Sequence, residues 1–171
     1  MLYQQLKQQL QDNRQSGASE LAIETLSHLH EFLQQTDTKT SAELANIVVE
    51  LSQIRPSMHA VTNALKRWLA QVITLHFNGE FRLHYLKQLA DIRVLLIQAS
   101  DHVVGHACQL IQPGQTILTH SRSSQVLAIF KMLKQQQSDF RVVVTVSAPG
   151  NEGFLVAEQL NHWQIPVSVI T

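Results

Sequence analysis

The residues best suited to chemistry lie together in the segment ILTHSRSSQVLAIF (residues 117–130), between an apolar run and a helical pattern. Within five positions the chain places one imidazole, three hydroxyls and one guanidinium, carried by His120, Ser121, Arg122, Ser123 and Ser124. Backbone N–H groups at the start of a helix are unpaired and carry a partial positive charge, so they bind phosphate readily. Serine hydroxyls and an arginine add donors and charge, and the segment is therefore a candidate phosphate-binding loop.

Two other interpretations compete for the same segment. Serine is a preferred N-cap residue, so Ser123 or Ser124 could simply cap the following helix, which is the commoner arrangement. A serine nucleophile is a weaker hypothesis, because the Gly-x-Ser-x-Gly motif is absent and no glycine flanks Ser121. The residues alone favour capping over phosphate binding and leave both open.

A second group of side chains has metal-ligand spacing. His102 and His106 stand four residues apart in a helical pattern, and Cys108 follows. No His-Glu-x-x-His motif is formed and no third ligand is placed, so we expect no metal site and no cofactor. Nothing cationic except histidine stands near the thiol, and we expect Cys108 to pack as a small apolar side chain.

The elements that position these residues change in kind along the chain. Residues up to Ile111 read as amphipathic helices, and one of them opens on a capping box from Thr40 to Glu43. Proline loses a helical hydrogen bond, so Pro56 breaks the chain and is tolerated at the first position of the next helix. That helix is expected to stop near Asn78-Gly79, and a long helix to run over about 80–111.

After Pro113-Gly114 short β-rich runs alternate with helical ones. We expect strands over 116–119, 141–146 and 167–171, and helices over about 123–137 and 152–163. Continuous apolar strands separated by helices indicate a parallel sheet buried on both faces, and right-handed crossovers would make it doubly wound. The fold class is α/β: a helical N-terminal domain (1–111) followed by a partial Rossmann-like domain of about three parallel strands in β-α-β-α-β order (112–171).

Composition sets limits on function. Thirteen basic and thirteen acidic residues cancel, so there is no sign of the basic surface that direct nucleic-acid binding uses. No apolar run approaches the roughly 20 residues that span a bilayer. One cysteine in 171 residues excludes an internal disulfide framework. We expect a soluble, cytoplasmic protein that uses neither membrane nor nucleic acid.

The order of several short motifs resembles one known family. These are Ser16-Gly17-Ala18, Arg55-Pro56-Ser57, the run from Gly114 to Ser121, Pro149-Gly150-Asn151-Glu152-Gly153, and Ile165-Pro166-Val167. The chain is similar to the family of initiation factor 2B alpha, beta and delta subunits, methylthioribose-1-phosphate isomerase and ribose-1,5-bisphosphate isomerase. The resemblance implies a helical domain followed by a Rossmann-like domain. It also implies a homodimer or a partner subunit of the same family.

The departures from the family pattern bear on catalysis. The isomerases carry a cysteine just after Thr-His, where this chain has Ser121, and an aspartate that would lie beyond Thr171. The pocket glutamate and arginine of the isomerases are replaced by Val146 and Ala148, and the arginine before Gly-Ala by Ser16. Serine cannot replace a thiolate without an activating partner. The resemblance therefore implies a C-terminally shortened, noncatalytic member, with no catalytic residue assigned.

The function expected on these grounds is that of an initiation factor 2B subunit-like protein, which binds partner subunits, a nucleotide or phosphosugar, or both. The ligand-binding residues implied are Gly17, Ala18, Arg55, His120, Ser121, Arg122, Ser123, Ser124 and Asn151. One alternative is an aldose–ketose isomerase of a ribose phosphate that needs a second chain. Another is a truncated relic with a structural role only.

Overall fold

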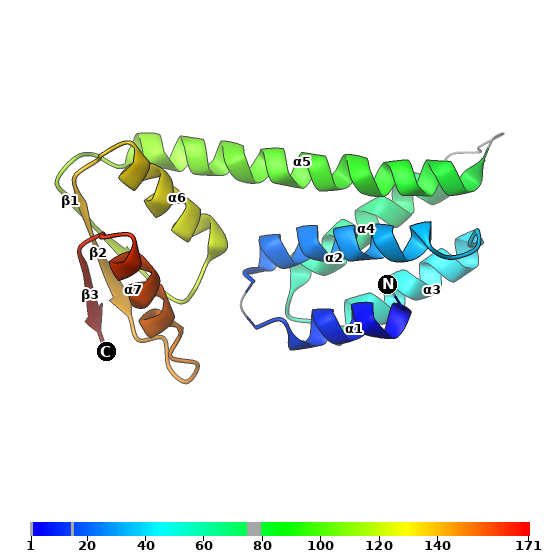
Figure 1. The fold of residues 1–171 in the computed structure, drawn as a ribbon, viewed down its shortest axis with the longest axis horizontal. Helices are drawn as coiled ribbons and strands as arrows, with labels where there is room; N and C mark the ends of the chain where they lie inside the picture. The colour runs from blue at the N-terminus through cyan, green and yellow to red at the C-terminus, as the bar shows by residue number, and fades with distance from the viewer. Residues whose placement is uncertain (1, 15, 75–79) are drawn as a thin grey trace. The chain divides into compact units, whose positions relative to one another are not determined.

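The computed structural model describes residues 2–14, 16–74 and 80–171, and it confirms the α/β class (Figure 1). The chain forms two compact units, Met1–Ala99 and Ser100–Thr171. The boundary between the units falls inside a long helix, whereas the change in sequence pattern lies at Pro113. The difference arises because the last turns of that helix contribute to the core of the second unit.

The first unit is helical and is built around one apolar core. It contains α1 (Tyr3–Asp12), α2 (Ala18–Gln34), α3 (Ser41–Ile54), α4 (His59–Thr74) and the first part of α5 (Phe81–Leu110). The apolar stripes expected on these helices are buried, because each repeats with the helical period. Trp68 is fully buried at the centre, and its indole N–H donates to the backbone oxygen of Tyr85 at 2.9 Å.

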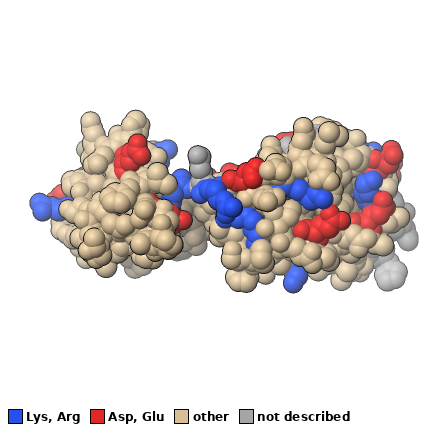
Figure 2. Space-filling model, turned by 90° about the horizontal axis from the view of Figure 1, so that it is seen from below, with Lys and Arg blue, Asp and Glu red and all other residues tan. Residues whose placement is uncertain are grey.

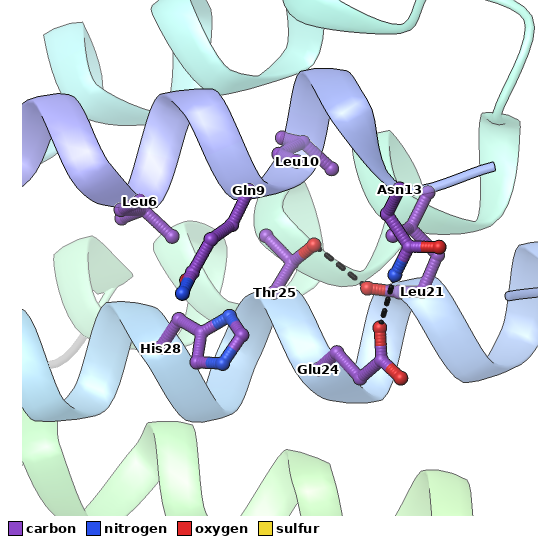
Figure 3. Close-up of a pocket in the computed structure, with 8 residues that line it drawn as sticks. All are labelled: Leu6, Gln9, Leu10, Asn13, Leu21, Glu24, Thr25 and His28. Atoms are coloured by element: carbon purple, nitrogen blue, oxygen red, sulfur yellow. Dashed lines mark hydrogen bonds between the residues drawn. The ribbon is translucent and has the colours of Figure 1, made fainter. Parts of the chain in front are cut away.

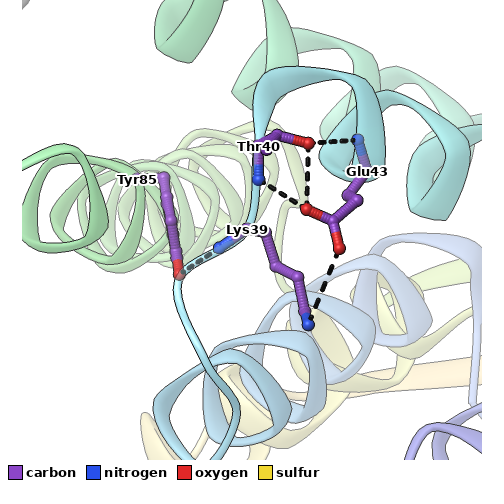
Figure 4. A network of polar contacts seen from close by, with 4 residues as sticks. All are labelled: Lys39, Thr40, Glu43 and Tyr85. Atoms are coloured by element: carbon purple, nitrogen blue, oxygen red, sulfur yellow. Dashed lines mark hydrogen bonds and ion pairs between the residues drawn. The ribbon is translucent and has the colours of Figure 1, made fainter.

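The predicted capping box at the start of α3 is confirmed (Figure 4). The hydroxyl oxygen of Thr40 accepts the backbone N–H of Glu43 at 3.2 Å, and the Glu43 carboxylate accepts the backbone N–H of Thr40 at 2.7 Å. The bond from the Thr40 backbone N–H, then the bond from the Thr40 hydroxyl and the charge of Lys39, lower the pKa of the Glu43 carboxyl. Lys39 is in turn held by its backbone N–H, which donates to the hydroxyl of Tyr85 at 3.5 Å.

The break between α3 and α4 differs in detail from the expectation. Pro56 lies in a turn rather than at the first position of a helix, and α4 begins at His59. The turn is closed by the N–H of Met58, which donates to the carbonyl of Arg55 at 2.9 Å. The expected end of α4 at Asn78-Gly79 lies outside the described residues.

The second unit contains the expected β-α-β-α-β order. Its elements are β1 (Gln115–Thr119), α6 (Ser124–Gln135), β2 (Phe140–Thr145), α7 (Glu152–His162) and β3 (Val167–Ile170). The strands pair in parallel in the order β1-β2-β3, with Val142 opposite both Ile117 and Val167. The prediction of a small parallel sheet is confirmed.

The prediction that this sheet is doubly wound and buried on both faces is wrong for the described residues. Right-handed crossovers that add each strand on the same side place both helices on one face, and α6 and α7 lie together there (Figure 1). In β2, Phe140 and Val144 are buried beneath these helices, whereas Arg141 on the other face is exposed. Within the second unit, the described residues leave the other face of the sheet uncovered.

The end of α5 completes the second core. Val104 and Cys108 pack with apolar side chains of α6, β2 and α7, of which Phe130 and Leu160 are almost fully buried. The Cys108 thiol lies 3.8 Å from the carbonyl oxygen of Ile129, and burial raises the pKa of this thiol. Cys108 therefore packs as a small apolar residue, as its surroundings in the sequence indicate.

Candidate functional site

The candidate site lies where β1 and β2 end side by side. In a parallel sheet the carboxyl ends of neighbouring strands meet at one edge, where α/β proteins bind ligands. The segment 120–123 follows β1 and the segment 146–151 follows β2. Their polar side chains form one connected network.

The network begins at the imidazole of His120. Its Nδ1 lies 2.7 Å from the hydroxyl oxygen of Thr145, the last residue of β2. The Thr145 hydroxyl lies 3.0 Å from that of Ser147, whose oxygen accepts the backbone N–H of Ser121 at 2.8 Å. The two loops are therefore held together by the side chains of Thr145, at the end of β2, and of His120 and Ser147 in the loops themselves.

The network ends on the carboxylate of Glu152, the first residue of α7. The Ser121 hydroxyl donates to Oε2 of Glu152, and the backbone N–H of Arg122 donates to the same oxygen at 3.3 Å. The bond from Ser121 and then that from Arg122 lower the pKa of the Glu152 carboxyl, helped by the positive charge of Arg122 and His120, against a smaller effect of burial. Glu152 is therefore held in its charged form.

Backbone conformation fixes this geometry. Ser121, Ser147 and Asn151 have φ values of 58°, 60° and 54°, in the left-handed region that non-glycine residues seldom occupy. At Gly153 a Cβ atom would lie 1.9 Å from the backbone oxygen of Thr145. Only glycine lets α7 approach β2 so closely, and this approach brings Glu152 to the loop that follows β1.

One serine of the loop has the capping role considered for it. Ser123 is the N-cap of α6, because its hydroxyl oxygen accepts the N–H of Val126 at 3.4 Å, and capping is confirmed. The N–H groups of Ser121 and Arg122 are directed to Ser147 and Glu152. A phosphate bound to these donors must displace the Glu152 carboxylate, and phosphate binding by the loop stays a prediction.

The other residues implied by the resemblance lie in the helical unit. Gly17 is the N-cap of α2 and Ala18 its first residue. The guanidinium of Arg55 donates to the backbone oxygen of Asn13, whose side-chain oxygen accepts the N–H of Ser16 at 2.9 Å. Asn13 thus links Arg55 to the turn that opens α2.

Asn151 belongs to the second unit with the loop residues. It is the N-cap of α7, and its backbone N–H donates to the carbonyl of Ser147 at 3.0 Å. Its side chain makes no capping bond. Asn151 therefore shapes the backbone of the site through its left-handed conformation.

Sequence reasoning did not single out Glu152, Thr145 or Ser147. An acidic residue in the first turn of a helix is common because it complements the helix dipole, so Glu152 carries no distinctive signal. The available signal was its place in the motif Pro149-Gly150-Asn151-Glu152-Gly153, one of the motifs that, with the loop after β1, carry the family resemblance. The contact itself depends on how α7 docks.

The described part of the chain also lacks two other functional features. It places no group of three or more histidine, cysteine or acidic residues where they could hold a metal. Within the same residues, no helix combines the length and hydropathy of a membrane span. Basic and acidic side chains are interspersed on the face of the helical unit drawn in Figure 2.

Comparison with known proteins identifies the family of the chain. The family model "Initiation factor 2 subunit family" matches residues 14–171. The eIF-2B subunit 2-like protein of Pyrococcus abyssi is 33% identical over 144 residues, which are 82% of this chain and 49% of that protein. A ribose 1,5-bisphosphate isomerase of Pyrococcus furiosus is 25% identical over 169 residues, which cover 90% of this chain and 50% of that protein.

Solved structures share the fold. The tetrameric eIF2B-beta2-delta2 complex of C. thermophilum has a TM-score of 0.78 at 22% identity, covering 98% of this chain and 58% of the matched chain. The 5-methylthioribose 1-phosphate isomerase of Pyrococcus horikoshii has a TM-score of 0.76 at 15% identity, and the match covers 98% of this chain and 51% of the matched chain. The chain spans about half the length of the curated relatives it matches.

This chain thus resembles initiation-factor and isomerase relatives in sequence and in fold. The resemblance predicted from the short motifs is confirmed. The match extends over the helical unit and the sheet unit alike. The chain belongs to the initiation factor 2 subunit family.

Proposed function

We propose that this chain is a noncatalytic, subunit-like member of its family that acts in the cytoplasm by associating with another family chain. The observation that carries the proposal is the hydrogen bond from Ser121 to Glu152. Ser121 occupies the position at which the resemblance places the isomerases' cysteine. A hydroxyl there has neither the acidity nor the nucleophilicity of a thiol.

Glu152 does not make Ser121 reactive. A general base works best when its pKa lies near the working pH. The contacts of Glu152 lower the pKa of its carboxyl below the ordinary value, away from neutrality. The nearby imidazole of His120 is engaged with Thr145 rather than with Ser121. The site therefore contains a positioned hydroxyl without a base suited to activate it.

The uncovered face of the sheet supports association. Leu118 of β1 and Ile170 of β3 are 65% and 45% exposed; in β2, Val143 is the neighbour of Leu118 and Thr145 is the neighbour of Ile170. Both β1 and β3 are edge strands of the described sheet. Exposed apolar side chains beside unpaired strand edges are typical of protein interaction surfaces. One solved relative of this fold is a tetrameric complex of subunits.

A small phosphorylated ligand is the second element of the proposal. It would bind at His120–Ser124 and replace the Glu152 carboxylate on the N–H of Arg122. The same loop in a catalytic chain would turn over a ribose phosphate, and the match to a ribose 1,5-bisphosphate isomerase keeps that function as the alternative. A structural relic would neither bind a ligand nor associate.

Two measurements test the proposal. The purified chain is assayed with ribose 1,5-bisphosphate and 5-methylthioribose 1-phosphate, alone and mixed with other family chains of the same genome. Sedimentation velocity on the same mixtures measures association. We expect a complex and no turnover. Turnover by the chain alone, or turnover in a mixture above that of the other chain alone, would establish the isomerase alternative, and a chain that stays monomeric in all of them would leave only the structural role.

A further inference from the structure

A pocket lies between α1 and α2 in the helical unit (Figure 3). Its volume is about 350 Å³, within the range of small-molecule sites. Leu6 and Leu10 of α1 and Leu21 of α2 line it, and all three are almost fully buried. These side chains form an apolar floor beneath the pocket and expose little of their own surface to it.

A positioned carboxylate stands at one end of the pocket. Glu24 accepts the side-chain N–H of Asn13 at 2.8 Å and the hydroxyl of Ser16 at 3.0 and 3.1 Å. Both donors are neutral, so they fix the carboxylate without cancelling its charge. A carboxylate accepts about four hydrogen bonds, so Glu24 has capacity for a ligand donor.

No cation of the described residues is paired with Glu24. The ion pairs found in the described ranges join lysines to Glu50, Glu43 and Asp91. Arg55, which approaches the same turn, donates to the backbone oxygen of Asn13. A partly buried, oriented carboxylate of this kind is suited to an ammonium group from outside the chain.

The other end of the pocket is polar. Gln9 extends from α1 toward His28 of α2 (Figure 3). His28 stands one helical turn from Glu24 on the same face of α2. An amide and an imidazole both donate and accept hydrogen bonds, which suits a hydroxyl group. The hydroxyl of Thr25, between the two ends, is already bonded to the carbonyl of Leu21 at 2.7 Å.

We propose that this pocket binds a small aliphatic amine that carries a hydroxyl group. The ammonium lies on Glu24, the carbon chain runs over the leucine floor between α1 and α2, and the hydroxyl lies between Gln9 and His28. This inference rests on the helical unit alone and is independent of the function proposed for the loop after β1.

The test is a titration of the whole chain, followed through the amide signals of α1 and α2 by nuclear magnetic resonance. The probe is 4-amino-1-butanol, compared with 1,4-butanediol, which lacks the charge, and n-butylamine, which lacks the hydroxyl. We expect saturable shifts with a Kd of about 1 mM for the amino alcohol, a magnitude usual for so small a ligand. The diol should bind about tenfold more weakly, because it loses a charge-assisted hydrogen bond.

Two variants locate the site. Glu24→Gln should weaken the amino alcohol to the level of the diol. Glu31→Gln, an exposed position on α2 with the same change in charge, should leave binding unchanged. Gln9→Ala changes an exposed residue that does not support the core, and should reduce the affinity for the amino alcohol to that for n-butylamine.

Three outcomes would overturn the inference. One is equal affinity for 4-amino-1-butanol and 1,4-butanediol, which would show that Glu24 contributes nothing. Another is equal loss in Glu24→Gln and Glu31→Gln, which would show general attraction of cations to the surface. The third is the lack of saturation in the unchanged chain, a result that does not depend on the folding of any variant.

Discussion

The hydroxyl of Ser121 donates a hydrogen bond to the carboxylate of Glu152, and this contact ties the loop after β1 to the first turn of α7. The same carboxylate accepts the backbone N–H of Arg122. Glu152 therefore occupies the donors that a phosphate would use, and it supplies the negative charge that a helix start favours. The site is filled by the protein's own anion.

This contact predicts a loss of stability in acid. The pKa of Glu152 is lowered in the folded chain, so its stabilising effect is complete above its ordinary value of 4.5 and is lost as the pH falls through the lowered value. Urea unfolding at neutral pH and at several pH values below about 4.5 should show a smaller acid loss for Glu152→Gln than for the unchanged chain.

The comparison separates Glu152 from the other acidic groups. The pKa of Glu43 is lowered as well, by its capping bonds, and it contributes in the same direction in both proteins. Only the difference between the two curves reports on Glu152. Parallel curves would show that the carboxylate does not stabilise the loop.

Removal of Glu152 should open the loop to anions. In Glu152→Ala the N–H of Arg122 and the hydroxyl of Ser121 lose their acceptor, and the repulsion between two negative groups disappears. Titration with inorganic phosphate should then give an affinity about tenfold higher than in the unchanged chain. Glu158→Ala, an exposed position on the same helix, serves as the control for net charge. Equal affinities in all three proteins would argue against a phosphate-binding loop.

Local patterns predicted the helices, the strands and the cap of α6, because hydrophobic period and capping depend on near neighbours along the chain. Ser123 could be recognised in this way, whereas Glu152 could not, because its partner Ser121 lies 31 residues away. Leu118 reads as a buried strand residue but is exposed. Its burial depends on strand order, which places both helices on the opposite face, and no local pattern encodes that order.

Gly153 should be intolerant of any side chain. A Cβ atom there would lie 1.9 Å from the backbone oxygen of Thr145, so Gly153→Ala must push α7 away from β2. We expect a loss of about 1–3 kcal/mol in the free energy of unfolding, as for other overpacked cores. Gly105→Ala is the matched control: it lies within α5 with nothing near its Cβ, and should gain about 1 kcal/mol. Equal effects would show that the close approach is relaxed in solution.

Thr40 should contribute to the stability of the helical unit. Its hydroxyl oxygen accepts the N–H of Glu43, which has no partner within the first turn of α3. Thr40→Ala should lower the free energy of unfolding by about 1 kcal/mol, and Thr40→Ser, which keeps the hydroxyl, by much less. Denaturant unfolding measures both. Equal losses in the two variants would assign the effect to the methyl group rather than to the cap.

The uncovered sheet face should control association. Leu118 is 65% exposed. It lies beside Val143 of the central strand β2 on that face. Leu118→Glu places a charge where a partner chain would pack, and burial of an unpaired charge is costly. Sedimentation velocity should show the complex lost, while the free energy of unfolding of the separate chain changes by no more than about 1 kcal/mol, the span of strand propensities. Leu155→Glu introduces the same charge at a side chain of α7 that is 56% exposed and lies off this face. The complex should survive Leu155→Glu, and a partner that is lost equally in both variants would show that association uses another surface.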